Sequence, residues 1–206
     1  VPGSRVQSWV SCPIEELGDD GDVLAKKFVQ AVEIAHHNNY RAVTHNKGIM
    51  NGVDALAIAT GNDFRAVDAG IHAYAGKDGN YRGLSRARIE KDVFWFELEI
   101  PLAVGTVGGL TKLHPLVQWS HQLLQNPNAK ELMQVMAVSG LAQNFAALRS
   151  LVTTGIQKGH MKMHLLNILN QMGATQPEKD AMIKHFTTNV VSFNAVEQAL
   201  ATWRKK

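Results

Sequence analysis

Lys47 and Asp63 are the residues best placed to do chemistry, because each is a charged side chain in a segment rich in Gly and Asn that predicts a turn. Between these segments lies a short run of small and apolar residues, Asn51 to Ala59, which predicts a helix. Such a helix would span roughly 14 Å, so turns at its ends could fold back and bring the two charges together. An ammonium group beside a carboxylate stays protonated and stays in place. The sequence therefore predicts a lysine–aspartate pair.

His160 and His164 form a second candidate pair, because their spacing puts both on one face of a helix. The same spacing occurs in H-E-x-x-H zinc sites, but Met161 stands where the glutamate would be and a third ligand is not evident. Spacing alone therefore favours structural histidines, and we expect no metal. A metal-dependent hydrolase that uses both residues is the weakest of the functional alternatives.

Composition indicates an ordinary soluble protein of one domain, or one domain and a small appendage. The chain has 206 residues, of which 45% are hydrophobic and 19% are charged. Its net charge of +3 is too small to indicate nucleic-acid binding, since no basic run precedes Arg204-Lys205-Lys206. A mildly basic chain would suit a small polyanionic ligand.

Cys12 is the only cysteine, which excludes an intrachain disulfide and a cysteine-based zinc site and fits a reducing cytoplasm. Apolar runs fall short of the roughly 18 residues that a membrane span needs, and the first residues lack a signal-peptide pattern. We therefore expect a cytoplasmic protein without a membrane segment. Because the sequence starts with Val1 and not with Met, we also expect it to be part of a longer chain.

Periodicity predicts an α+β fold that is rich in helices and has a few strands. Glycine-rich residues 105–112 lack the order of a P-loop or of a Rossmann turn, so they do not predict a nucleotide site by themselves. The expected strands are residues 6–13, 86–89 and 94–101. The expected helices are residues 23–37, 51–59, 63–75, 128–153, 177–186 and 193–204, with two more that begin near His114 and after Gly155.

Four motifs in this order resemble 3-hydroxy-3-methylglutaryl-coenzyme A (HMG-CoA) reductase of the bacterial class II type: H-N-K-G-I-M-N-G, G-N-D-x-R, G-T-V-G-G-x-T-K-x-H-P and G-H-M-x-x-H. The resemblance runs over nearly the whole chain. It implies that residues 1–158 are the C-terminal part of the large, substrate-binding domain. Residues 159–206 would then be the mobile C-terminal flap, a small helical domain that closes over bound substrate.

The resemblance also assigns catalytic roles. Lys47 matches the lysine that polarises the thioester carbonyl and stabilises the oxyanion formed when hydride attacks, and Asp63 matches the aspartate that holds this lysine. His160 matches the histidine that protonates the departing coenzyme A thiolate, a task that suits a pKa near neutrality.

Five further residues match substrate-binding positions of the family. Arg41 would bind the carboxylate of the acyl group, and Asn51 would join the hydrogen-bond network around the lysine. Gln143 and Asn144 would make further substrate contacts, and His164 would lie near coenzyme A.

The implied reaction interconverts HMG-CoA and mevalonate plus coenzyme A with two molecules of NADPH or NADH. The family's nucleotide-binding domain and its catalytic glutamate have no match here, so the cofactor site would lie largely outside this chain, in a missing N-terminal half. Family members form homodimers with the active site at the interface. The alternative is that the chain alone is a non-catalytic module for acyl-coenzyme A binding and dimerisation.

Overall fold

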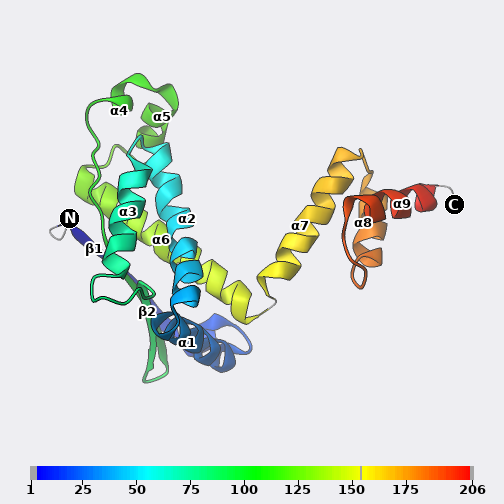
Figure 1. Ribbon diagram of the computed structural model, residues 1–206, viewed down its shortest axis with the longest axis horizontal. Helices are drawn as coiled ribbons and strands as arrows, with labels where there is room; N and C mark the ends of the chain where they lie inside the picture. The colour runs from blue at the N-terminus through cyan, green and yellow to red at the C-terminus, as the bar shows by residue number, and fades with distance from the viewer. Residues whose placement is uncertain (1–3, 154, 205–206) are drawn as a thin grey trace. The chain divides into compact units, whose positions relative to one another are not determined.

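The computed structural model describes residues 4–153 and 155–204, with only the backbone of residues 156–160 and 162. The chain divides into two compact units, residues 1–152 and residues 153–206 (Figure 1). The boundary predicted from the sequence lies between residues 158 and 159. The identification of the second unit as a flap stays a prediction. The predicted α+β, helix-rich fold class is confirmed.

The sheet of the first unit contains three antiparallel strands in the order β1–β3–β2: β1 (Arg5–Pro13), β2 (Ser85–Glu90) and β3 (Val93–Pro101). Lys91 and Asp92 both have positive φ in the turn between β2 and β3, as a tight hairpin requires. Because side chains alternate along the central strand, β3 buries Phe94, Phe96 and Leu98 on one face. All three predicted strands are confirmed.

Helix α1 (Gly21–His37) covers the buried face of this sheet, after the short helix η1 (Ile14–Leu17). Its apolar residues recur at helical spacing, so Phe28 and Val32 enter the core together. The Phe28 ring meets those of Phe94 and Phe96 edge-on, with centroids 5.2 and 5.0 Å apart. This aromatic cluster joins the helix to the sheet.

Helix α2 (Asn39–Ala59) runs without a break through the segment in which the sequence predicted a turn around Lys47. That prediction, and with it a separate helix over residues 51–59, is wrong. Gly48 and Gly52 lie on the buried face of α2, and at Gly52 the lack of a side chain lets helix α6 (Ala129–Val152) approach closely. Burial of Ile49 and Val53 in the same stretch offsets the helix-breaking tendency of glycine, which is about 1 kcal/mol per residue.

Helix α6 is long and apolar enough, by length and composition, to resemble a membrane span. However, it packs against α2 and the sheet in the first unit, where Leu132, Met136 and Leu148 belong to the core and are at most 1% exposed. It also carries the buried polar residue Asn144, whose side chain forms hydrogen bonds with Ser85 and with the His45 carbonyl. These contacts are those of a core helix in a globular unit.

The other helices of the first unit follow the ends of α2 and β3. Helix α3 (Phe64–Ala75) packs beside α2, and a glycine-containing segment after β3 leads into α4 (Leu110–Leu113) and α5 (Pro115–Leu123). Pro115 occupies the first turn of α5, as predicted.

The second unit consists of α7 (Ile156–Gln171), α8 (Gln176–His185) and α9 (Phe193–Arg204) around a small core of its own. Leu169, Met182 and Val196 come from the three helices and meet in that core. Glu178 forms a capping box with Thr175 and an ion pair of 2.7 Å with Arg204. Hydrogen bonds from Arg204 and from the Thr175 backbone lower the pKa of Glu178 to about 2.

Candidate active site

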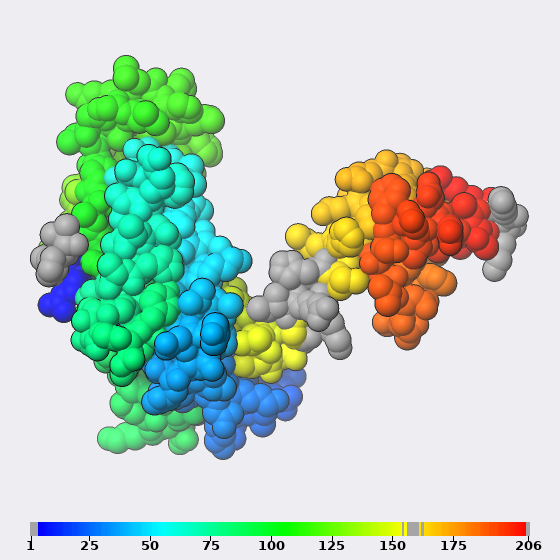
Figure 2. Space-filling view, in the orientation of Figure 1, coloured from blue at the N-terminus to red at the C-terminus, as the bar shows by residue number. Residues whose placement is uncertain are grey.

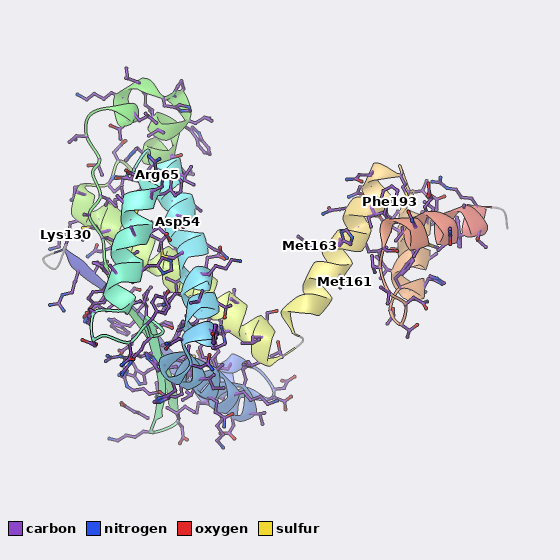
Figure 3. The ribbon with its side chains drawn as sticks, in the orientation of Figure 1. Asp54, Arg65, Lys130, Met161, Met163 and Phe193 are labelled. Atoms are coloured by element: carbon purple, nitrogen blue, oxygen red, sulfur yellow. The ribbon has the colours of Figure 1, made fainter. Side chains whose placement is uncertain are left out.

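Lys47 and Asp63 do not meet within one chain. Lys47 lies in the middle of α2, which continues for about 18 Å before it ends at Ala59. Asp63 caps α3 and accepts hydrogen bonds from the backbone N–H groups of Arg65 (3.1 Å) and Ala66 (3.3 Å). Figure 3 shows Arg65 at this end of α3. The pairing predicted from the turns is therefore not formed inside this unit, although the predicted N-cap is confirmed.

The electrostatics of Asp63 follow from its cap. Its carboxylate is exposed and pairs with Arg65 at 3.5 Å. The hydrogen bond from the Ala66 N–H, assisted by the charge of Arg65, lowers the pKa of Asp63 below its ordinary value. A carboxylate that is ionised and lies at the surface can still form an ion pair with a cationic side chain of another molecule.

Lys47 stands on an exposed face of α2. Tyr40, Thr44, Lys47, Asn51 and Ile58 follow one another at spacings of three, four or seven residues, and all five are exposed. Lys47 and Asn51 are one turn apart, so their side chains are neighbours on this face. The cyan atoms of α2 reach the surface in Figure 2. The structure thus places Lys47 and Asn51 side by side, and the hydrogen-bond network around the lysine stays a prediction.

Arg41 lies at the start of the same helix and is half-buried. Its Nη1 donates a hydrogen bond of 2.7 Å to Oγ1 of Thr44, a member of the exposed face. Burial lowers the pKa of Arg41, but its guanidinium remains charged near neutral pH. Arg41 can therefore add positive charge beside the Lys47 face.

Helix α6 supplies the two other predicted residues of this unit, and it places them differently. Gln143 is exposed, and its Cγ lies 2.8 Å from where a Cβ on Gly52 would be, so it lies over α2 at the residue that follows Asn51. Asn144 is 1% exposed. Its amide bonds inward to Ser85 (2.7 Å) and to the His45 carbonyl (3.2 Å), so the predicted contact of Asn144 with substrate stays a prediction.

Sequence reasoning missed His45, which is 1% exposed and lies two residues before Lys47. Its Nε2 makes a hydrogen bond of 2.7 Å with Oγ of Ser85. Burial, with the nearby charges of Arg41 and His36, lowers the pKa of His45 to about 3, so the ring is neutral at pH 7. A histidine on the apolar side of a correctly predicted helix would have signalled a buried polar group.

The predicted histidines of the second unit lie on α7. His164 is exposed, and the side chain of His160 lies outside the described residues. Both residues belong to one helix, as predicted, and are separated by about one turn. Among the described side chains, groups of three or more metal-ligating residues do not occur.

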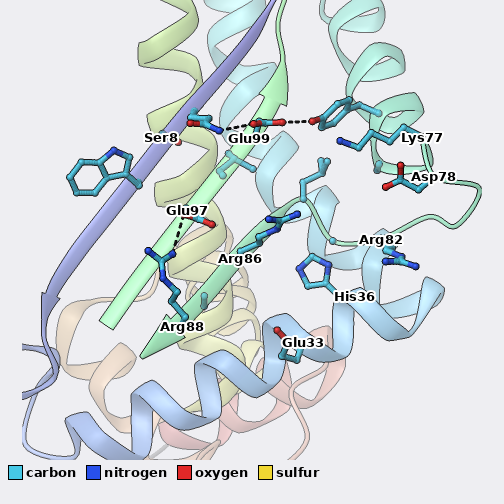
Figure 4. A pocket seen from close by; sticks show the side chains of 18 residues that line it. Ser8, Glu33, His36, Lys77, Asp78, Arg82, Arg86, Arg88, Glu97 and Glu99 are labelled. Carbon is cyan, nitrogen blue, oxygen red and sulfur yellow. Dashed lines mark hydrogen bonds and ion pairs between the residues drawn. The ribbon is translucent and has the colours of Figure 1, made fainter. Parts of the chain in front are cut away.

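The cavity beside the sheet does not contain the predicted site. It has a volume of about 580 Å³ and opens between the sheet and the ends of α1 and α3, and its walls carry charges of both signs (Figure 4). Glu99 accepts hydrogen bonds there from Tyr74 and, at 2.6 Å, from Gln7, which lower its pKa. The residues predicted to bind substrate or to act in catalysis are not among those that line this cavity.

The hydroxymethylglutaryl-coenzyme A reductase family model matches residues 6–165. The chain belongs to this family. It is 47% identical over 165 residues to the 3-hydroxy-3-methylglutaryl-coenzyme A reductase of Archaeoglobus fulgidus, covering 80% of this chain and 38% of that protein. It is 38% identical over 181 residues to a probable reductase of Borreliella burgdorferi, covering 85% of this chain and 42% of that one.

Solved structures of Streptococcus pneumoniae reductase share this fold. One is 40% identical with a TM-score of 0.72 and covers 97% of this chain and 49% of its own. Another is described as the class II enzyme bound to NADPH in open conformations. It has a TM-score of 0.71 at 40% identity, and the match covers 97% of this chain and 50% of its own. The chain thus spans about half the length of the relatives it matches.

Proposed function

We propose that this chain forms the C-terminal half of an HMG-CoA reductase. The reaction would be HMG-CoA + 2 NAD(P)H + 2 H⁺ → mevalonate + coenzyme A + 2 NAD(P)⁺. The observation that carries the proposal is the exposed face of α2, on which Lys47 and Asn51 are neighbours and beside which α6 presents Gln143. Family membership supports the substrate, and the NADPH-bound relative supports a nicotinamide cofactor, held largely outside this chain.

In this proposal, Lys47 stabilises the negative charge that develops on the thioester oxygen when hydride attacks. A fixed cation aimed at a developing oxyanion contributes most where water is excluded. Since Lys47 is exposed in this unit, another surface must cover it during the reaction. Arg41 would bind the acyl carboxylate, His160 would protonate the coenzyme A thiolate, and His164 would contact coenzyme A.

We further propose that two copies associate in the cytoplasm and that Asp63 of one copy meets Lys47 of the other. The length of α2 between Lys47 and its end at Ala59, before Asp63, supports a contact between copies. The Asp63 turn is tied to the segment before α4 and to α5, because Asn62 accepts a hydrogen bond of 2.8 Å from Gly105 and the Thr60 carbonyl lies 3.2 Å from His121 Nε2. The apolar row beside this turn is 55–85% exposed and comprises Val107, Leu110, Leu113, Leu116, Trp119 and Leu123.

An apolar row of this size on a soluble protein indicates an interface. A second copy that covered it would lie next to Asp63 and could bring its own α2 face there. The active site would then contain residues of both copies.

The first experiment follows NADPH or NADH oxidation by the complete reductase on addition of HMG-CoA. Lys47→Ala is expected to reduce turnover at least about a thousandfold without unfolding the enzyme, and turnover near that of the unchanged enzyme would refute the role of Lys47. Mixing Lys47→Ala subunits with Asp63→Ala subunits tests the arrangement. If Lys47 and Asp63 act across the interface, each mixed dimer regains one intact site of two. If they act within one chain, mixing restores nothing.

The second candidate function is a non-catalytic module that binds acyl-coenzyme A. The coverage of about half of each relative favours it for the chain as it stands. Calorimetry with coenzyme A on the 206-residue chain and a turnover assay on the complete reductase that contains it separate the two functions: binding by the chain without turnover of the complete protein supports the module.

A further inference from the structure

Three buried polar side chains form a closed ring of hydrogen bonds beneath Lys47. His45 of α2, Ser85 at the start of β2 and Asn144 of α6 are each at most 1% exposed. His45 Nε2 and Ser85 Oγ are 2.7 Å apart, Ser85 Oγ donates to Asn144 Oδ1 at 2.7 Å, and Asn144 Nδ2 donates to the His45 carbonyl at 3.2 Å. Three elements distant in sequence are thus joined at one point.

The proton positions in the ring follow from its donors. Ser85 has one hydroxyl hydrogen, which it gives to Asn144, so it must accept the hydrogen carried by His45 Nε2. Every donor therefore points to the next acceptor around the ring. Networks of this kind resist displacement, because loss of one member leaves the others buried without partners.

The ring acts on the part of α2 that carries the proposed reactive face. Asn144 bonds to the backbone carbonyl of His45, two residues before Lys47. Gly48, the residue after Lys47, lies beside α6, where an added Cβ would be in ordinary van der Waals contact with Asn144 Nδ2 at 3.6 Å. The backbone on both sides of Lys47 is therefore held against α6.

The strand end that carries Ser85 is itself fixed. The Ser85 carbonyl bonds to His36 Nε2 of α1 at 2.9 Å. Asn46 of α2 donates to the Arg82 carbonyl at 2.8 Å and accepts from the Leu84 N–H at 3.0 Å. The ring is thus anchored to α1, α2, α6 and β2 together.

We propose that His45 and Ser85 are positioning residues, which hold the Lys47 and Asn51 face in the geometry that hydride attack on the thioester requires. This inference rests on the proposed function of Lys47. Neither residue reaches the exposed face, so both act through the backbone of α2 and through Asn144. A displacement of about 1 Å at a reacting group can reduce a rate by about a hundredfold.

The test uses the complete reductase and the variants Ser85→Ala, His45→Leu and His45→Gln, with Lys47→Ala as the reference for an inactive site. Glutamine can place an N–H donor near the position of the imidazole Nε2, whereas leucine cannot. We expect Ser85→Ala and His45→Leu to lower kcat about 10- to 100-fold at saturating HMG-CoA. We expect the loss of log kcat in His45→Gln to be at most half of the loss in His45→Leu.

Thermal unfolding distinguishes positioning from a purely structural role. A structural role would lower the unfolding temperature of Ser85→Ala while kcat per folded molecule stayed normal, and this result would overturn the proposal. Normal kcat in Ser85→Ala and His45→Leu beside an inactive Lys47→Ala would overturn it too, and would leave the proposed function intact. An active Lys47→Ala would refute both. If Ser85→Ala fails to fold, Ser85→Cys keeps the size and weakens the hydrogen bonds, and its normal kcat would equally overturn the proposal.

Discussion

Gly52 of α2 lies directly against Ser139 of α6, so that a Cβ on Gly52 would sit 2.5 Å from the Ser139 carbonyl oxygen. Ser139 Oγ also donates a hydrogen bond of 3.2 Å to the Gly52 carbonyl. The two longest helices of the first unit therefore meet backbone to backbone beside Asn51. This contact sets how far the Lys47 face stands from Gln143.

Gly52→Ala is expected to destabilise the first unit by about 1–3 kcal/mol, because the methyl group would force the helices apart. Urea unfolding followed by circular dichroism measures the change. Gly70→Ala in α3 is the matched control, since a Cβ there has open space and alanine favours a helix by about 1 kcal/mol. Equal stability of the two variants would contradict the close contact.

The buried His45 predicts a loss of stability in mild acid. Its pKa is about 3 in the folded state and about 6.5 when unfolded, so the unfolded state binds a proton first as the pH falls. The free energy of unfolding should therefore decrease from about pH 6.5 downward. In His45→Gln this part of the pH dependence should be smaller, and an unchanged profile between pH 7 and 5 would contradict a neutral, buried ring.

Glu178 predicts a second transition at lower pH, in the second unit. Because its pKa is lowered to about 2, its stabilising effect is present above the ordinary value near 4.5 and is lost as the pH falls from there to about 2. Hydrogen exchange of the backbone amides of α8 and α9 reports on this unit within the full chain. Glu178→Gln should exchange faster at pH 6 and respond less to acid, whereas Asp180→Asn, on the same helix, should behave like the unchanged chain.

Substitution of Asp54 is expected to stabilise the chain. Its Oδ1 is buried without a hydrogen-bond partner in the described part of the chain, and burial, with the charge of Asp68, raises its pKa. Asp54→Asn removes the charge at nearly constant shape, so the free energy of unfolding should rise at pH 7. The gain should vanish near pH 3, where the aspartate is protonated. A stability loss at pH 7 would show that the carboxylate has a partner.

The apolar row formed by Val107 and by residues of α4 and α5 predicts self-association. Leu116→Glu places a charge in that row and should shift the complete reductase toward monomers in sedimentation velocity, with loss of turnover. Val190→Glu alters another largely exposed apolar residue, in the second unit, and should leave the mass unchanged. A Leu116→Glu enzyme that keeps both its mass and its activity would place the interface elsewhere.

Apart from α2, the strands and the longer helices could be predicted from sequence, because their signals are local. Alternation in β3, the apolar spacing of α1, the cap at Asp63 and the proline of α5 each depend on neighbours in the chain. The motifs around Lys47 and His160 are local as well, so the amino-acid sequence is enough to indicate the family.

Tertiary structure decided how the glycines and the charges are used. Glycine is compatible both with a turn and with close helix contact, and only the neighbouring α6 shows that Gly52 serves contact. That choice makes α2 continuous, so the second half of this helix separates Lys47 from Asp63 at the cap of α3. The ring of His45, Ser85 and Asn144 joins residues far apart in sequence, so no local pattern could reveal it; it exists because buried polar groups must find partners wherever the fold brings them together.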